Sequence, residues 1–540
     1  MSLFDRILAA RGLSGDSVGE FLSPNYDKKH DPFLLPDMSK AVDRLVAARE
    51  KQEKITIYGD YDIDGLTATT VLIDAFDSFG FKYIDAFIPN RFVEGYGLTI
   101  DAVEAIAATG AQLIVTVDCG SLSHKEIARA NELGVDVIVT DHHNVADTPP
   151  PAIATINPKR KDHKYPFIDL AGVGVAFKLV QALQTRLSGL PVGSEKWLLD
   201  LVALGTVCDV VTLVDENRTN VFYGLKVLAK TRRPGLRALM AVARIDPDKV
   251  NSRSLGFGLG PRMNASGRLE TAKHSLDMLL SRSVEDAFLK AEKLDVLNIA
   301  RRADQDKIFK QAIIQAEQFK DDPVLVVSGA DWNHGIVGIV AAKLLEKYKK
   351  PTYVLQEMGE TSKGSARSYG GFSAVAAIRA SDDIITKGGG HTLAAGVTLP
   401  TENIESFRRR VNKFYADLNL NDQESLLLPM EDVEIEDLSE VTEELLAQLD
   451  QLEPFGSANP EPILKIKDVV VTGRKQMGAD NQHVKLEVRD KNGKYLQVLA
   501  FSAPSHFFVE PGECVTILFQ PTLNEWQGKR TVEGRLLHLS

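Results

Sequence analysis

Cysteine is scarce in this chain of 540 residues: only Cys119, Cys208 and Cys514 occur, and no two of them form a CxxC pair. This excludes a disulfide framework and a zinc ribbon. Long apolar runs are missing as well, and none approaches the roughly 20 residues that a membrane-spanning helix needs. The first residues lack the basic and apolar regions of a signal peptide, so we expect a cytoplasmic protein with no membrane partner.

Positive charge is also in short supply, because 63 lysines and arginines face 74 aspartates and glutamates and leave a net charge of −11 at pH 7. This balance argues against broad, non-specific attraction to a polyanion. It does not exclude a polyanionic ligand. Bound cations would cancel part of the negative charge, and arginines could line a local groove.

The chain is too long for one hydrophobic core, and its length predicts about three to four domains. We predict an α/β fold with a C-terminal β-barrel. Changes of pattern divide the chain into an N-terminal helical cap at 1–50, a parallel-sheet α/β domain at 51–282, a long connector helix at 283–320, a smaller α/β domain at 321–415, a helical linker at 416–453 and five short strands at 454–540. Five strands of this spacing are typical of an OB-fold.

Acidic residues follow three short apolar runs of the larger α/β domain. Residues 55–59 precede Asp60, Asp62 and Asp64, residues 113–117 precede Asp118, and residues 137–140 precede the sequence DHH at 141–143. Helix-like stretches of about ten or more residues separate the runs, so the strands should be parallel, with their carboxyl ends at one sheet edge. A solvated Asp-Gly turn would explain the first run equally well. The acidic residues at the other strand ends favour a cluster of ligands at one sheet edge over such a turn.

With Asp209, which ends another apolar run, these positions supply oxygen and imidazole ligands for a metal site: Asp60, Asp62, Asp64, Asp118, Asp209 and the triplet Asp141, His142 and His143. Carboxylate-rich sites with one imidazole favour Mg²⁺ or Mn²⁺ over zinc. Enough ligands are present for two ions. Two ions roughly 3.5 to 4 Å apart generate hydroxide and stabilise the attacking and leaving oxygens in phosphoester cleavage.

Several motifs resemble the DHH phosphoesterase family. The signature is matched by GDYDIDG at 59–65, VDCG at 117–120 and DHH at 141–143. One branch of the family, the single-strand-specific exonucleases, is resembled further by DPF at 31–33, GYGL at 95–98, GLGPRMNASGR at 258–268, SARS at 365–368 and GGGH at 388–391. The resemblance covers almost the whole chain in order and spacing.

This resemblance implies a DHH-type parallel-sheet domain, a smaller α/β DHH-associated domain joined to it by the long helix, and a C-terminal OB-fold that binds substrate. The implied activity is metal-dependent 5′ to 3′ degradation of single-stranded DNA to mononucleotides in DNA repair and recombination. The implied cofactors are two Mn²⁺ or Mg²⁺ ions. The implied partners are single-stranded DNA, a single-strand-binding protein and a helicase, for a protein that acts as a monomer.

The resemblance also implies residue roles. The catalytic set is Asp62, Asp64, Asp118, His142, His143 and Asp209, with Asp118 as the bridge between two ions and His143 facing the phosphate. Asp60 either binds the second ion or supports its neighbours. The set that binds substrate phosphates is Arg91, Arg262, Asn264, Arg268, Ser365, Arg367, Gly389, Gly390 and His391. Among these, Arg91, Ser365 and Arg367 would hold the 5′ phosphate and so enforce polarity.

The glycine run at 388–390 has a physical rationale of its own, since successive backbone N–H groups can cradle an anion. Taken alone, such a run is more often a flexible loop, by roughly three to one. Two other functions stay open. One is a DHH phosphodiesterase of short RNAs or cyclic dinucleotides, and the other is a non-catalytic replication scaffold that only binds DNA.

Overall fold

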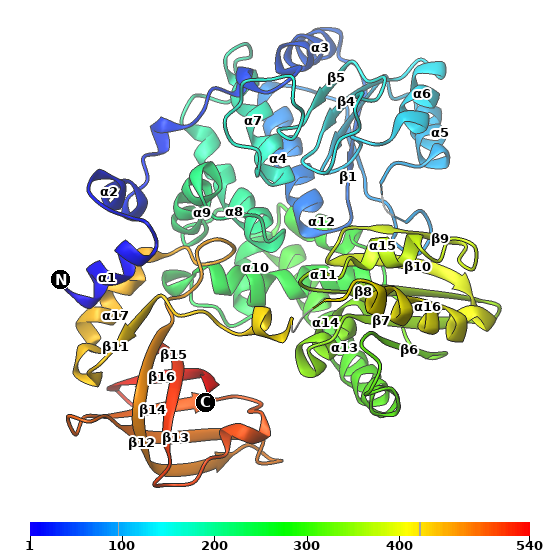
Figure 1. The fold of residues 1–540 in the computed structure, drawn as a ribbon. Helices are drawn as coiled ribbons and strands as arrows, with labels where there is room; N and C mark the ends of the chain where they lie inside the picture. The colour runs from blue at the N-terminus through cyan, green and yellow to red at the C-terminus, as the bar shows by residue number, and fades with distance from the viewer. Residues whose placement is uncertain (96, 421–422) are drawn as a thin grey trace.

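The structure, a computed structural model, describes residues 1–95, 97–420 and 423–540. Tyr96 of the GYGL motif and residues 421–422 of the predicted linker lie outside the described residues. The chain forms a parallel-sheet domain, a long helix, a second α/β domain and a C-terminal barrel (Figure 1). This is the predicted fold class. In the described part of the chain, no helix is both long and apolar enough to span a membrane.

The first sheet has five parallel strands in the order β2-β1-β3-β4-β5. The strands are β1 (Ile55–Gly59), β2 (Ile84–Phe87), β3 (Leu113–Val117), β4 (Asp136–Thr140) and β5 (Ala154–Ile156). Every residue of β1 and β3 is buried, as expected for strands that helices cover on both faces. The carboxyl ends of the five strands therefore share one edge.

Helices cover both faces of this sheet. One face packs in a core with α3 (Met38–Lys51), α4 (Ile63–Phe79) and α7 (Gly172–Gln184), and the other with α5 (Ile100–Ala108) and α6 (His124–Glu132). A helical layer follows, made of α8 (Leu199–Cys208), α9 (Asp215–Leu228), α10 (Pro234–Val242), α11 (Gly260–Leu269) and α12 (Lys273–Leu279). The glycine-rich segment at 254–268 is helical, because a π-helical turn at Ser254–Leu259 runs directly into α11.

The predicted connector is α13 (Val284–Gln318), which leads into the second α/β domain. That domain has a mixed sheet in the order β6-β7-β8-β10-β9. Its strands are β6 (Leu325–Gly329), β7 (Thr352–Met358), β8 (Thr361–Arg367), β9 (Lys387–Gly390) and β10 (Ala394–Pro400), and its helices are α14 (Val337–Tyr348), α15 (Ala374–Arg379) and α16 (Ile404–Asp417).

The C-terminal barrel contains the five predicted strands. They are β12 (Leu464–Met477), β13 (His483–Arg489), β14 (Tyr495–Ala500), β15 (Cys514–Trp526) and β16 (Lys529–Leu539). Pairing of β12 with β15 closes the ring β12-β13-β14-β16-β15, as in an OB-fold. The preceding segment adds β11 (Val433–Ile435) at the edge of β12 and α17 (Glu443–Leu449).

The N-terminal segment, predicted as one cap, is shared between two cores. Its first helix, α1 (Leu3–Ala10), buries Leu3, Phe4 and Ile7 in the core of the C-terminal barrel and lies beside α17 and β11 (Figure 1). The later part, with Tyr26 and α3, packs in the core of the parallel-sheet domain. The segment therefore links the two ends of the chain.

Candidate metal centre

The predicted acidic residues meet at one edge of the first sheet. Asp60 directly follows β1, and Asp118 directly follows β3. Asp62 is the N-cap residue of α4, and Asp64 lies in the first turn of that helix. The run after β1 therefore turns into a helix at once instead of continuing as the extended strand that its alternation suggested. Asp209 approaches from the helical layer as the C-cap residue of α8.

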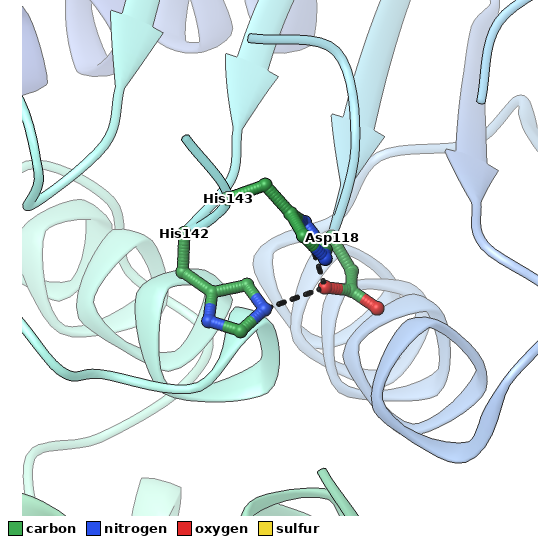
Figure 2. Close-up of side chains that lie close together, drawn as sticks. All are labelled: Asp118, His142 and His143. Carbon is green, nitrogen blue, oxygen red and sulfur yellow. Dashed lines mark ion pairs between the residues drawn. The ribbon is translucent and has the colours of Figure 1, made fainter. Parts of the chain in front are cut away.

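The ligand atoms form one continuous cluster. Within 4.8 Å of one another lie Asp60 with Asp62 and Asp118, Asp64 with His142 and Asp209, and Asp118 with His142 and His143. Figure 2 shows both imidazoles directed at Asp118: His142 Nε2 is 3.0 Å and His143 Nδ1 is 3.7 Å from Asp118 Oδ1. The predicted metal ligands are thus all brought together, and Asp118 belongs to two of the three groups.

Backbone geometry holds Asp118 and Asp64 in place. Asp118 has a φ of 60°, a left-handed conformation that costs a residue with a Cβ about 1 to 2 kcal/mol. A Cβ on Gly172 would lie 2.7 Å from Asp118 Oδ1, so glycine leaves room for this carboxylate. The Asp64 carboxylate accepts hydrogen bonds from Gly172 N (2.6 Å) and Val173 N (2.8 Å) at the amino end of α7, where the helix dipole favours a negative charge.

Asp141, the first residue of the DHH motif, positions the two histidines. Its Oδ1 accepts from the backbone N–H groups of His142 (2.7 Å) and His143 (3.0 Å) and lies 2.9 Å from His143 Nδ1. Its Oδ2 accepts from Ser121 N at 2.9 Å. Burial alone would raise the pKa of Asp141. The hydrogen bond with His143 and the positive charge of that imidazole outweigh burial and hold the pKa of Asp141 well below its ordinary value. The sequence analysis had assigned this residue no such positioning role.

Burial and mutual repulsion raise the pKa values of four carboxyl groups in the cluster. Burial and the charge of Asp62 raise the pKa of Asp64 to about 7, and burial with the charges of Asp64 and Asp62 raises that of Asp209 to about 9. Burial and neighbouring aspartates also raise the pKa values of Asp60 and Asp118 well above their ordinary range. Near neutral pH, these carboxyl groups bind either protons or cations, because so many negative charges at one place repel one another.

The pKa values of the two histidines are shifted in opposite directions. Burial and the charge of His143 lower the pKa of His142 to about 3, so His142 offers a neutral imidazole of the kind that binds metals. Burial alone would lower the pKa of His143, but its hydrogen bond with Asp141 and the charges of Asp141 and Asp62 raise it. A cationic His143 fits the predicted place beside a phosphate.

The donor set fits a divalent cation. In the described residues, four buried atoms of the cluster have no partner in hydrogen-bond geometry: Asp60 Oδ1, Asp118 Oδ1, His142 Nε2 and Asp209 Oδ2, although His142 Nε2 and Asp118 Oδ1 lie 3.0 Å apart. Buried polar atoms ordinarily have partners, so these four point to a shared ligand. Carboxylate oxygens with one imidazole suit Mg²⁺ and Mn²⁺.

Guanidinium groups from distant parts of the chain gather beside the acidic cluster. The Arg91 guanidinium stacks on the Tyr61 ring, 4.2 Å from its centroid. Burial and the charge of Arg91 lower the pKa of Arg367. Burial and neighbouring guanidinium groups, that of Arg91 first among them, lower the pKa of Arg268 to about 9. These cations lie close enough to repel one another and to favour an anion between them. We call these four residues the arginine group: Arg91, Arg268, Arg301 and Arg367.

Ser365 and Arg367 lie on one face of β8, as their spacing predicted, because burial alternates along that strand. The first turn of α14 lies over both. A Cβ on Gly338 would be 3.4 Å from Ser365 Oγ and 3.3 Å from Arg367 Nη2. A hydroxyl, a guanidinium and a helix amino end thus meet at one place, which is a suitable arrangement for a phosphate.

The remaining predicted phosphate ligands lie elsewhere. Arg262 pairs with Asp295 (Nε to Oδ1, 2.8 Å) and donates to Gly258 O at 2.8 Å, which ties it to α13. Asn264 lines a cavity together with Arg268. The strand β9, which carries Gly389 and Gly390, is exposed, as is His391. The roles of these residues stay predictions.

Sequence reasoning missed three residues near the centre. Arg301 of α13 is buried beside Arg268, but a charged helix gives no sign of which arginine turns inward. Lys159 adds positive charge near His142 and Asp209. Asn157 directly follows β5 and donates to His143 O at 2.9 Å. The strand-end rule that found Asp60 and Asp118 would also have found Asn157, had the short run of β5 been taken as a strand.

A cavity of about 880 Å³ lies between the end of α8 and the barrel. Its lining includes Cys208, the neighbour of Asp209, then Arg268 and Arg301, and finally Gln520 and Arg535 of the barrel. The cavity therefore lies between the helix end next to Asp209, two members of the arginine group and the C-terminal domain.

Family comparisons match three parts of the chain. Residues 54–206 match the DHH family N-terminal domain, residues 321–417 the DHHA1 domain and residues 432–538 the RecJ OB domain. The chain is 38% identical over 531 residues to the single-stranded-DNA-specific exonuclease RecJ of Bacillus subtilis, covering 97% of this chain and 66% of that protein. It is 35% identical over 522 residues to RecJ of Escherichia coli, covering 92% and 89% respectively.

Comparison with solved structures points to the same family as the sequence comparisons. A crystal structure of RecJ in complex with Mn²⁺ from Thermus thermophilus matches 99% of this chain and 77% of that chain, with a TM-score of 0.80 and 27% identity. A crystal structure of exonuclease RecJ bound to manganese matches 74% of this chain and 98% of that chain, with a TM-score of 0.64 and 32% identity. The full-length match, the three domains and the shared fold lead to one conclusion: the chain belongs to the RecJ family of the DHH phosphoesterases.

Proposed function

We propose that this protein is a metal-dependent exonuclease that degrades single-stranded DNA from its 5′ end to mononucleotides. The observation that carries the proposal is the contact between two clusters of opposite charge. Arg91, which stacks on Tyr61, belongs to the arginine group, and Tyr61 itself lies between Asp60 and Asp62 in the sequence. A 5′ phosphate held by the arginines would place the next phosphodiester at the acidic cluster.

Each cluster would then have a separate task. Ser365, Arg367 and Arg91 would hold the terminal phosphate, and this pocket for a chain end would enforce polarity. Asp60, Asp62, Asp64, Asp118, His142 and Asp209 would hold two Mn²⁺ or Mg²⁺ ions, with Asp118 as the shared ligand. When bound, such ions lower the pKa of water and stabilise the charge that develops on phosphoester oxygens. His143, kept protonated by Asp141, would donate to a non-bridging oxygen of the scissile phosphate.

The barrel and the cavity favour a long strand over a dinucleotide as substrate, since a site for dinucleotides alone would not extend to Gln520 and Arg535. The complete set of ligands favours catalysis over a purely DNA-binding scaffold, because clustered buried carboxylates destabilise a protein without cations. We place the activity in DNA repair and recombination, for a cytoplasmic monomer that works beside a helicase and a single-strand-binding protein.

The test uses single strands labelled at the 5′ or the 3′ end and incubated with Mn²⁺. The 5′ label should be released first and as a mononucleotide. Asp118→Ala should abolish release while DNA binding stays measurable. Early release of the 3′ label would contradict the polarity, and cleavage by the Asp118→Ala protein would contradict the metal-bridge role.

A further inference from the structure

Arg218, on α9, joins three parts of the molecule. Its side chain is buried, and its guanidinium donates to backbone carbonyls from two distant segments. Nε and Nη2 reach Phe21 O at 3.1 and 3.0 Å, Nη2 reaches Leu452 O at 3.2 Å and Glu453 O at 3.0 Å, and Nη1 reaches Pro454 O at 3.4 Å. The guanidinium also lies 3.7 Å from the centroid of the Phe21 ring.

The carbonyls that Arg218 meets belong to a unit of their own. Phe21 packs against the core of the C-terminal barrel. Asn459 Nδ2 donates to Leu452 O at 2.9 Å and to Pro454 O at 2.8 Å, and Asn459 Oδ1 accepts from Arg11 at 2.8 Å. The N-terminal segment and the barrel therefore present a preformed set of acceptors. Arg218 supplies the donors from the parallel-sheet domain.

The position of α9 connects this contact to the metal centre. The helix packs beside α8, which ends at Asp209, and the loop between them donates from Leu213 N to Ser457 O of the barrel at 2.8 Å. The cavity that begins at Cys208 ends at Gln520 and Arg535 of the barrel. The cavity is thus lined by both the helical layer and the barrel, so a displacement of the barrel would change its shape.

Other charged contacts across this interface are weaker. Arg253 meets Glu461 at 3.9 Å and Lys249 meets Glu525 at 3.8 Å, and all four side chains are substantially exposed. Exposed ion pairs contribute little to stability, whereas a buried hydrogen bond from a charged group contributes clearly more. The buried guanidinium of Arg218, with its four carbonyl acceptors, is thus the stronger contact between α9 and the unit formed by the N-terminal segment and the barrel.

We propose that Arg218 is a positioning residue that fixes the C-terminal barrel across the cavity from the metal centre and so lets the enzyme hold long single strands. The proposal rests on the function proposed above. Arg218 touches neither the acidic cluster nor the arginine group. Its loss should leave the cleavage of very short substrates intact and weaken the grip on long ones.

The test compares Arg218→Met with the wild type on a 5′-phosphorylated trinucleotide and on a strand of about 40 nucleotides, well beyond the roughly 4 to 16 that one OB-fold covers. We expect an unchanged kcat on the trinucleotide and a KM about tenfold higher on the long strand, the effect of losing a second, tethered binding site. Small-angle scattering of the free protein should show a larger radius of gyration, a result that does not depend on activity.

Arg44→Met is the matched control. Arg44 is also well buried and pairs with Glu53 and with Asp136 at the start of β4, at the sheet edge opposite the metal centre. It should lower thermal stability without changing the ratio of the two KM values. Arg218→Lys, which keeps the charge but has a smaller donor set, should show an intermediate KM ratio.

Several results would overturn the proposal. One is an equal loss on both substrates with an unchanged radius of gyration. Another is failure of both Arg218 variants to fold, which would make the residue part of a core. A wild type that cleaves neither strand would contradict the proposed function instead, while the scattering comparison would still decide whether Arg218 fixes the barrel.

Discussion

Replacing Asp209 by asparagine should have opposite effects on stability with and without metal. Asp209 Oδ2 is buried and has no hydrogen-bond partner among the described residues, and burial with the charges of Asp64 and Asp62 raises its pKa to about 9. A carboxyl whose pKa is higher in the folded than in the unfolded state destabilises the fold increasingly as pH rises between the two values. Without metal, the wild type should therefore lose stability from about pH 4 to pH 9.

The magnitude follows from the size of the pKa shift. One pKa unit corresponds to about 1.4 kcal/mol, so at pH 8, about four units above the ordinary value, the penalty for Asp209 has a ceiling of about 6 kcal/mol. Neighbouring carboxyl groups can take up a proton when one charge is removed. We therefore expect Asp209→Asn to stabilise the metal-free protein by about half of that ceiling, roughly 3 kcal/mol.

In excess Mn²⁺, we expect Asp209→Asn to lower the stability of the protein instead of raising it. A ligand that binds only the folded state stabilises it by about 2.7 kcal/mol at a hundred times its dissociation constant. Asparagine removes an anionic ligand, so the variant should gain little from Mn²⁺ and fall below the loaded wild type. The assay is thermal or urea unfolding at pH 8, once in EDTA and once in excess Mn²⁺.

Asp200 provides the control, because it is a buried aspartate on the same helix that has partners. It accepts from Thr231 Oγ1 at 2.6 Å and from Arg233 Nε at 3.1 Å. Asp200→Asn should destabilise the protein in both conditions, by about 3 to 5 kcal/mol for a broken buried pair. If Asp209→Asn behaved like this control in EDTA, or kept the full Mn²⁺ effect, the reasoning about the cluster would be refuted.

Three further changes test separate parts of the centre. Arg367→Ala should raise KM for 5′-phosphorylated strands by about tenfold, since it removes a charge-assisted contact, and should leave KM for 5′-hydroxyl strands unchanged; equal effects on both would refute its role in end binding. Gly172→Ala places a Cβ 2.7 Å from Asp118 Oδ1; a displacement of this kind should lower kcat about a hundredfold, and normal activity would show that the carboxylate can move aside. Asp141→Asn should weaken Mn²⁺ binding about 10- to 100-fold in calorimetric titration, as loss of a residue that orients a ligand does; unchanged affinity would mean that His142 is positioned without it.

The clustering of the acidic residues could be predicted from the sequence because the local pattern and the fold give the same answer. Buried parallel strands end at one edge, so Asp60 and Asp118, each placed directly after such a strand, must lie near one another. The long helix and the barrel strands were predictable for a similar reason, since their periodicity extends over many residues. Asp62 and Asp64 show the limit of this reasoning, because alternation of charge did not reveal that a helix begins at residue 63.

Contacts between distant segments could not be predicted. Arg91 and Arg367 lie in different domains and meet only because α13 brings the second α/β domain over the first sheet edge. An amphipathic pattern shows that one face of α1 is buried but does not show which core receives it, and that core is at the opposite end of the chain. The resemblance to a family supplied Arg91 and Arg367, whereas Arg301 was missed because neither pattern nor motif distinguished it from Arg302.

The distribution of charge resolves how a chain with a net charge of −11 can act on a polyanion. A net negative surface repels DNA at long range and so suppresses non-specific binding. Arg301 is buried and the other three members of the arginine group are half-buried, so their attraction for a phosphate would be stronger than that of exposed lysines. The acidic cluster attracts cations, which in turn screen it from the backbone that it cleaves. The proposed selectivity for a strand end would follow, because only an end could bring its phosphate into this pocket.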